Sequence, residues 1–177
     1  MKYALTLILA AAILLAACTE DQRRFAIDAA QVSLSLATIN TQFDLAVANV
    51  DRSVFSAEEQ ARLDAAIGAL RALQTSLKTL ITQRGGVGQL LLNVDETGRL
   101  FAQGKQAYLD AKAVIVPHLK DLPLEDQRML SEMDRSAKRI DQALQAITTA
   151  PDGTDITPYV HDALLIAKGV ATLAAAL

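Results

Sequence analysis

Cysteine, histidine and aromatic residues are scarce in this chain of 177 residues. It has one cysteine, two histidines, no tryptophan and only 4% aromatic residues. A single cysteine excludes a disulfide within the chain, so the fold must be held by packing alone. Few aromatic side chains are available to stack on bases, and the net charge of −3 argues against a basic nucleic-acid-binding surface. We therefore expect no nucleic acid among the partners.

Motifs of the common catalytic and metal centres are also missing. Neither His118 nor His161 has a glutamate three residues before it, as carboxylate-bridged di-iron bundles require. One cysteine cannot form the Cys-x-x-Cys-His attachment site of c-type haem. The glycine-rich segment at 85–88 is not followed by Lys-Ser/Thr, so we interpret it as a turn between helices. We expect no catalytic residue, no metal site and no cofactor, and the chain is predicted not to be an enzyme.

One ligand-binding alternative stays open. A b-type haem in the core of a helical bundle would use Met129 or Met133 together with His161. Methionine in a helical core more often fills space, and His118 beside Pro117 is interpreted as a loop or helix-terminal residue. In a second form of this alternative, an interior lined by small residues such as Gly104 and Ala111 holds a lipid.

The longest apolar run is at the N terminus, MKYALTLILAAAILLAAC. Lys2 precedes it, residues 4–17 carry no charge, and small residues lead directly to Cys18. A basic start, an apolar middle and a small-residue end are typical of a cleaved secretory signal peptide. The run is shorter than the roughly 20 apolar residues of a transmembrane helix. An uncleaved anchor and an ordinary signal peptide remain as alternatives.

The sequence Leu15-Ala16-Ala17-Cys18 resembles the lipobox of bacterial lipoproteins. The resemblance implies cleavage between Ala17 and Cys18, a diacylglycerol on the Cys18 sulfur, and usually a further acyl chain such as palmitate on its amino group. Thr19, rather than aspartate, follows the cysteine. In a bacterium with two membranes this implies export to the outer membrane, facing the periplasm. The expected partners are the membrane, through the N-terminal lipid, and an envelope protein.

Removal of residues 1–17 leaves 160 residues with a formal charge of −4, because Lys2 is lost. That length suffices for one domain with a hydrophobic core. Alanine and leucine dominate it, and β-branched residues are scattered, so an all-α fold is predicted. We divide the mature chain into the lipidated Cys18 with a very short tether over residues 18–22, and a single helical-bundle domain over residues 23–177.

Apolar residues spaced by three and four predict four long helices and a shorter fifth. We expect the first helix to begin at a cap formed by Thr19 and Gln22 and to end at Val50. Its heptad positions are Phe25, Ala29, Val32, Leu36, Ile39, Phe43, Ala46 and Val50. A capping box at Ser56 and Glu59 opens the second helix.

The third helix is predicted to begin at Leu90 and to end or kink at Pro117, with a close helix approach at Gly104. Pro123 suits the first turn of the fourth helix, and Thr157-Pro158 is interpreted as N-cap and first residue of the fifth. Short connections predict an antiparallel up-down bundle of the four long helices. The fifth helix should lie along one groove or cap one end.

These features favour a lipid-anchored helical bundle of the bacterial envelope with a structural or protein-interaction role. The carrier of a hydrophobic ligand or haem is the first alternative. An accessory or phage-derived exclusion lipoprotein is the second, and gene neighbourhood rather than sequence would identify it. The oligomeric state stays open.

Overall fold

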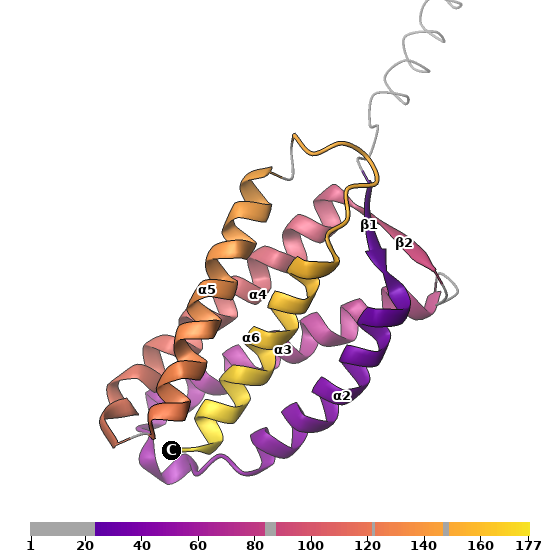
Figure 1. Ribbon diagram of the computed structural model, residues 1–177. Helices are drawn as coiled ribbons and strands as arrows, with labels where there is room; N and C mark the ends of the chain where they lie inside the picture. The colour runs from indigo at the N-terminus through magenta and orange to yellow at the C-terminus, as the bar shows by residue number, and fades with distance from the viewer. Residues whose placement is uncertain (1–23, 84–87, 122, 147–148) are drawn as a thin grey trace, which may run out of the picture.

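The computed structural model describes residues 24–177 except 84–87, 122 and 147–148. Most of these residues are helical, and a small two-stranded sheet lies at one end of the helices (Figure 1). The predicted predominance of helix is therefore confirmed. The elements in chain order are β1 (Arg24–Asp28), α2 (Ala29–Ala48), the 3₁₀-helix η1 (Arg52–Val54), α3 (Ala57–Gln83), β2 (Gln89–Asn93), α4 (Val94–Ile115), the 3₁₀-helix η2 (Val116–Asp121), α5 (Leu124–Ala146) and α6 (Thr157–Ala175).

Helix α6 is the centre of the fold. It contacts α2, α3, α4, α5 and β1, and in Figure 1 it lies between α2 and α5. Twelve of its 19 residues are buried. The prediction that this helix lies along a groove or caps one end is wrong. Small residues such as Ala163, Ala167 and Ala171 let neighbouring helices approach from several sides, and a helix that is apolar all round is expected to be buried.

The starts of the first and third predicted helices are also wrong. Residues 24–28 and 89–93 form antiparallel strands, with Phe25 opposite Leu92 and Ile27 opposite Leu90. Five residues are too few to separate a strand period from a helix period. In residues 24–28 three apolar residues stand in a row, and such a short run fits a strand or a helix equally well. The pairing joins segments about 65 residues apart, which no local pattern reveals. The predicted cap at Thr19 and Gln22 lies outside the described residues.

The residue at the end of each strand caps the following helix. The Asp28 carboxylate accepts a hydrogen bond from Gln31 N at 3.0 Å, and Asn93 Oδ1 accepts one from Asp95 N at 2.7 Å. Aspartate and asparagine are among the best N-cap residues because they satisfy free amides of the first turn. Helices α2 and α4 therefore begin where the strand pairing stops.

Three helix boundaries follow the predicted signals. The capping box that opens α3 is confirmed: Ser56 N donates to Glu59 Oε2 at 2.8 Å, and Glu59 N donates to Ser56 Oγ at 3.3 Å. Helix α4 ends two residues before Pro117. Helix α5 begins at Leu124, so Pro123 lies directly before the first turn and one position outside its predicted place. Proline supplies no amide hydrogen, so it is tolerated at a helix start but not in its interior.

Thr157 has a different role from the predicted N-cap. Ile156 occupies the N-cap position of α6 and makes no side-chain capping bond. The Thr157 hydroxyl instead accepts a hydrogen bond from Asp28 N at 2.8 Å and donates to Asp155 Oδ1 at 2.6 Å. Ala26 also bonds this segment, through its amide to Thr154 O and its carbonyl to Ile156 N. The start of α6 is thereby fixed to the junction between β1 and α2.

Close helix approaches occur at two glycines. A Cβ at Gly104 of α4 would lie 2.9 Å from Leu73 Cδ2 of α3, so the predicted close approach is confirmed. A Cβ at Gly169 of α6 would lie 2.3 Å from Met133 Sδ of α5. The contacts α3–α4 and α5–α6 both depend on a missing side chain.

Candidate functional site

The predicted lipidation and cleavage residues, Ala17 and Cys18, lie outside the described residues. None of the described helices is both long enough and apolar enough to span a bilayer. The described chain starts at Arg24, six positions after Cys18. Strand β1 is therefore the described element nearest to Cys18 along the chain.

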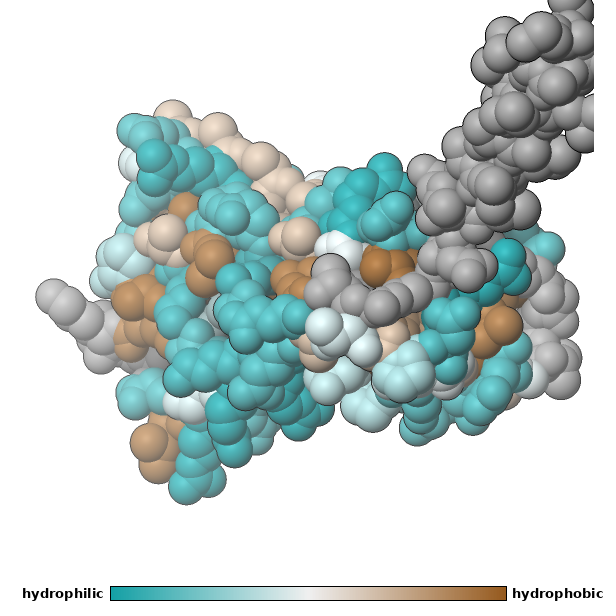
Figure 2. Space-filling model, turned by 90° about the horizontal axis from the view of Figure 1, so that it is seen from above, coloured by the Kyte–Doolittle hydropathy of each residue, from teal (hydrophilic) through white to brown (hydrophobic). Residues whose placement is uncertain are grey.

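Backbone hydrogen bonds hold β1 firmly on two sides. One side pairs with β2, and on the other Gly153 N donates to Arg24 O at 2.7 Å. Arg24 N also donates to Asp152 Oδ1 at 3.2 Å. Figure 2 views the molecule from this end, and most of the visible described surface there is hydrophilic, with separate hydrophobic spots. At this end of the molecule, β1 is held by hydrogen bonds on both sides and the surrounding surface is mainly polar.

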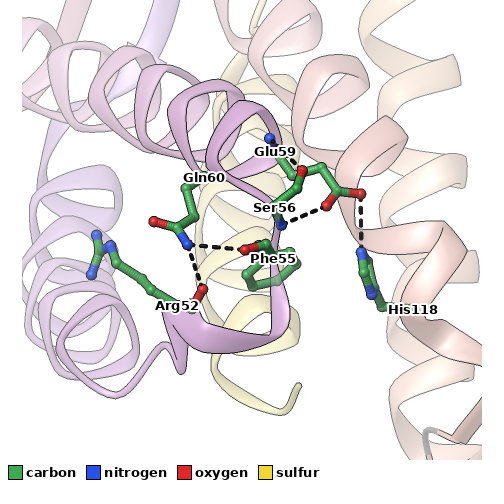
Figure 3. A network of polar contacts seen from close by, with 6 residues as sticks. All are labelled: Arg52, Phe55, Ser56, Glu59, Gln60 and His118. Carbon is green, nitrogen blue, oxygen red and sulfur yellow. Dashed lines mark hydrogen bonds and ion pairs between the residues drawn. The ribbon is translucent and has the colours of Figure 1, made fainter.

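The opposite end carries a cluster of polar contacts, in which the His118 ring of η2 meets the start of α3 (Figure 3). His118 Nε2 lies 3.1 Å from Glu59 Oε1, and the His118 ring packs edge-on against Phe55 with the ring centroids 5.1 Å apart. Gln60 Nε2 donates to the carbonyls of Arg52 and Phe55 at 2.7 and 2.9 Å. The connection before α3 and the one after α4 are thereby joined.

The amide and hydroxyl of Ser56, followed by His118, lower the pKa of Glu59 to about 2. Glu59 is therefore an anion at neutral pH. Ser56 Oγ accepts from Glu59 N, and His118 contacts the carboxylate rather than the serine. A serine nucleophile needs a base within hydrogen-bond reach of its hydroxyl, and His118 bonds a different group. The cluster therefore holds the connection before α3 against the connection after α4.

A second polar cluster lies between α5 and α6. Arg139 donates to both carboxylate oxygens of Asp162, at 2.8 and 2.7 Å, and Ser136 Oγ donates to Asp162 Oδ1 at 3.0 Å. The Asp162 side chain is 4% exposed, whereas that of Arg139 is 56% exposed. Sequence reasoning missed this pair. The signal for it was Asp162 itself, an acidic residue within the otherwise apolar face of the fifth predicted helix.

A shallow groove of about 670 Å³ lies beside this pair, between α2 and α6. Its walls combine aliphatic side chains such as Leu34, Ile39 and Leu165 with the cations of Arg139 and Lys168. His161 also lines it, while its Nε2 atom is buried without a hydrogen-bond partner among the described residues. The groove is an opening on the surface and not an enclosed cofactor cavity.

The residues considered for haem or lipid are distributed over different parts of the core. Met133 is buried against Gly169, eight residues along α6 from His161, which corresponds to about 12 Å of helix. The described structure does not bring Met133 and His161 together as a ligand pair. Leu73 fills the space beside Gly104, and Ala111 is fully buried.

A third polar cluster links α4 to α5. Asp134 Oδ1 accepts from Tyr108 Oη at 2.5 Å and from Lys112 Nζ at 2.5 Å. Burial first, and then the hydrogen bond to Asp134 and its negative charge, raise the pKa of Tyr108 far above its usual range. Burial opposes ionisation of Asp134, but the hydrogen bonds from Lys112 and Tyr108 outweigh it and keep the pKa of Asp134 below its ordinary value. The cluster holds two helices together and exposes no free nucleophile.

Among the described residues, no group of three or more histidine, cysteine, aspartate or glutamate side chains is placed to hold a metal ion. The clusters join pairs of elements, and the candidate anchor lies before the first strand. No protein-family model, no curated protein and no solved structure matches this chain.

Proposed function

We propose that this chain is a lipid-anchored helical-bundle protein of the bacterial envelope, attached through Cys18, with a structural or protein-interaction role. The observation that carries the proposal is the combination of the Leu15–Cys18 motif with a helical body whose described part begins at Arg24. A leader, a cysteine and a domain follow one another with almost no chain between them.

The anchor and the body are close in space as well as in sequence. Arg24 follows Cys18 by six positions, and a fully extended chain over six positions spans at most about 20 Å. The β1 end of the domain must therefore stay near the bilayer. The hydrophilic surface at that end suits attachment through a lipid rather than insertion of the domain (Figure 2).

We further propose that the helices form an up-down bundle with its far end turned away from the membrane. Contacts between α2 and α3, α3 and α4, α4 and α5, and α5 and α6 support neighbouring positions for consecutive helices. The far end carries η1, η2 and the Glu59–His118 contact. An envelope partner is proposed to bind these distal connections, because they stand farthest from the anchor.

Thr19, which follows the cysteine, favours the outer membrane as the location, with the domain in the periplasm. The carrier alternative has less support. Leu73 occupies the space beside Gly104, and the groove beside α6 is open and shallow.

Mass spectrometry of protein extracted from the membrane fraction tests the proposal. We expect a chain that begins at Cys18 and carries the added mass of a diacylglycerol and an acyl group. The Cys18→Ser variant should keep residues 1–17 and carry no acyl mass. An unmodified Cys18, or a wild-type chain with residues 1–17 intact, would show that the anchor assignment is wrong.

A further inference from the structure

Helix α2 has a second uncharged face, directed away from the core. Its buried residues include Val32, Leu36 and Phe43. Eleven residues of α2 are exposed, and six of them recur at spacings of three and four. We call these six the outer face of α2: Ala30, Leu34, Ala37, Thr41, Leu45 and Ala48. At 100° per residue they form one stripe on the side of the helix opposite the buried residues.

The two leucines of this face are unusually exposed. Leu34 is 74% exposed and Leu45 is 61% exposed, and their separation of 11 positions places them about 16 Å apart along the helix. Thr41 Oγ1 donates to Ala37 O of the same helix, and Thr38 Oγ1 donates likewise to Leu34 O. With these hydroxyl protons used within the helix, the face presents mainly carbon atoms.

Charge is almost absent from α2. Asp44 is the single charged residue among its 20, and Arg71 of α3 pairs with it at 2.9 Å. A solvent-facing helix normally carries charged residues opposite its buried side. Exposed leucines on an uncharged surface indicate a contact face.

We infer that the outer face of α2 pairs with the same face of a second copy of this chain, with the two helices parallel. In a two-fold pair of parallel helices, each residue of the face lies beside its own counterpart. A charged residue there would oppose a like charge, so the lack of charge at these six positions suits self-pairing. Asp44 borders the face and is paired with Arg71. The spacing of three and four is that of helices packed lengthwise.

The position of the anchor sets the direction of the pair, so the inference rests on the proposed function. Cys18 precedes α2 by 11 residues, and both copies are held by the same bilayer. An antiparallel pair of upright helices would place one N terminus at the far end, beyond the reach of its tether. Two copies on one membrane also meet at a high effective concentration, so a modest contact area suffices.

Other occupants suit the face less well. Helices that lie on a membrane surface carry lysine or arginine on the polar side and large aromatic residues on the other. The 20 residues of α2 contain no lysine, arginine or tryptophan, and its one phenylalanine, Phe43, is buried. The lipid surface is therefore not favoured.

Cysteine cross-linking in intact membranes tests the pair. Full-length chains with Ala30→Cys, Ala37→Cys or Ala48→Cys are treated with a short thiol-to-thiol cross-linker. Parallel pairing predicts dimers from all three variants, because each cysteine lies beside its own counterpart. Antiparallel pairing predicts a dimer from Ala37→Cys alone, near the centre of the face, and would overturn the inference. The matched control is Ala102→Cys, an exposed alanine on α4, which should stay monomeric.

Introducing negative charges into the contact gives a second test. Leu34→Glu with Leu45→Glu, added to Ala37→Cys, should lower the cross-linked fraction roughly tenfold, because two apolar contacts are replaced by like charges. Both positions are exposed, so the fold should persist, and circular dichroism checks this. Leu124→Glu, at a leucine that is 65% exposed on α5, is the control and should change nothing.

The same membrane samples separate the two proposals. The wild-type chain, whose one thiol is at Cys18, is cross-linked in parallel, and its mass reports lipidation. Acylated Cys18 with no dimer from any α2 variant would overturn the pairing and leave the anchor intact. Unmodified Cys18, with dimers from all three variants and none from the wild-type chain, would overturn the anchor and leave the pairing. Cross-linking only to a different protein would show that the face binds another partner and would also overturn the inference.

Discussion

Helices α2 and α5 both pack on the central helix α6, but they differ strongly in charge. Helix α5 carries nine charged residues among 23, whereas α2 carries one among 20. The α5–α6 contact includes the bidentate Arg139–Asp162 pair, while the α2 residues buried in the core are all apolar. The outer side of α5 is an ordinary solvated surface. The outer side of α2 has the composition of a surface that is covered.

The difference shows two ways to fix a helix on the same support. A buried carboxylate bonded by an arginine and a serine specifies one position for α5, because any shift leaves the charge unpaired. Apolar packing holds α2 and depends on shape. Perturbing each contact separately tests this distinction.

Loss of Arg139 should have one of the largest effects, because it strands a charge in the core. We expect Arg139→Ala to lower the free energy of unfolding by about 3 kcal/mol, the low end for a buried pair, because Asp162 loses its cation but the Arg139 side chain is itself 56% exposed. Urea unfolding followed by circular dichroism measures the change. Arg135→Ala is the control on the exposed side of the same helix, and a loss equal to that of Arg139→Ala would contradict the assignment.

Truncation of a leucine separates the two faces of α2. Leu36 is 3% exposed, so Leu36→Ala should lower the free energy of unfolding by about 3 kcal/mol through lost burial and the remaining cavity. Leu34→Ala, on the outer face, should cost less than about 0.5 kcal/mol in the monomer. Denaturant titration of both variants at low protein concentration checks this, and equal losses would mean that the outer face belongs to the core.

Added volume at Gly169 tests the close approach of α5 to α6. We expect Gly169→Ala to cost about 1–3 kcal/mol, because its Cβ would overlap Met133 Sδ at 2.3 Å and force the core to shift. Gly68→Ala is the matched control, since it lies within α3 with nothing within 4 Å of its Cβ. The free energy of unfolding of that control should rise by about 1 kcal/mol, because alanine has a higher helix propensity than glycine. Thermal unfolding of the pair gives the sign of each change.

Low pH should lower the local stability of α5 more than that of α2. The pKa of Asp134 is lowered in the folded state from its ordinary 3.8, so its bonds to Lys112 and Tyr108 stabilise the fold above that pH. This contribution is lost as the pH falls through the lowered folded pKa. Protection factors from amide hydrogen exchange, each corrected for the intrinsic rate at its pH, should therefore fall more in α5 than in α2 between pH 7 and pH 3. Asp134→Asn should reduce the difference, and an unchanged α5 at pH 3 would contradict the prediction.

Local signals in the sequence predicted several boundaries well. The capping box at Ser56 and Glu59, the stop before Pro117 and the start after Pro123 depend on residues within one or two turns of each other. Such interactions are present in any fold that uses the helix, so the sequence alone reveals them. The close approach at Gly104 could also be predicted, because a glycine inside a helix lowers its stability and is usually explained by close packing against a neighbour.

The wrong predictions concern contacts between distant segments. Residues 24–28 fit a heptad pattern, but pairing with residues 89–93 makes them a strand. The predicted cap role of Thr157 failed because its hydroxyl bonds Asp28 N, 129 positions away. The bond between His118 and Glu59 likewise joins connections that are 59 residues apart.

The sequence by itself determined that the body is helical, where several helices begin and end, and that the N terminus resembles a lipoprotein leader. Those properties depend on composition, periodicity and neighbouring residues. Tertiary structure alone decided that the last helix is central, that two short segments pair as strands, and that α2 keeps an uncharged face outside. The physical reason is that burial is a property of the whole fold. A stretch of alanine and leucine looks the same in sequence whether other helices cover all of it, as in α6, or only one side, as in α2.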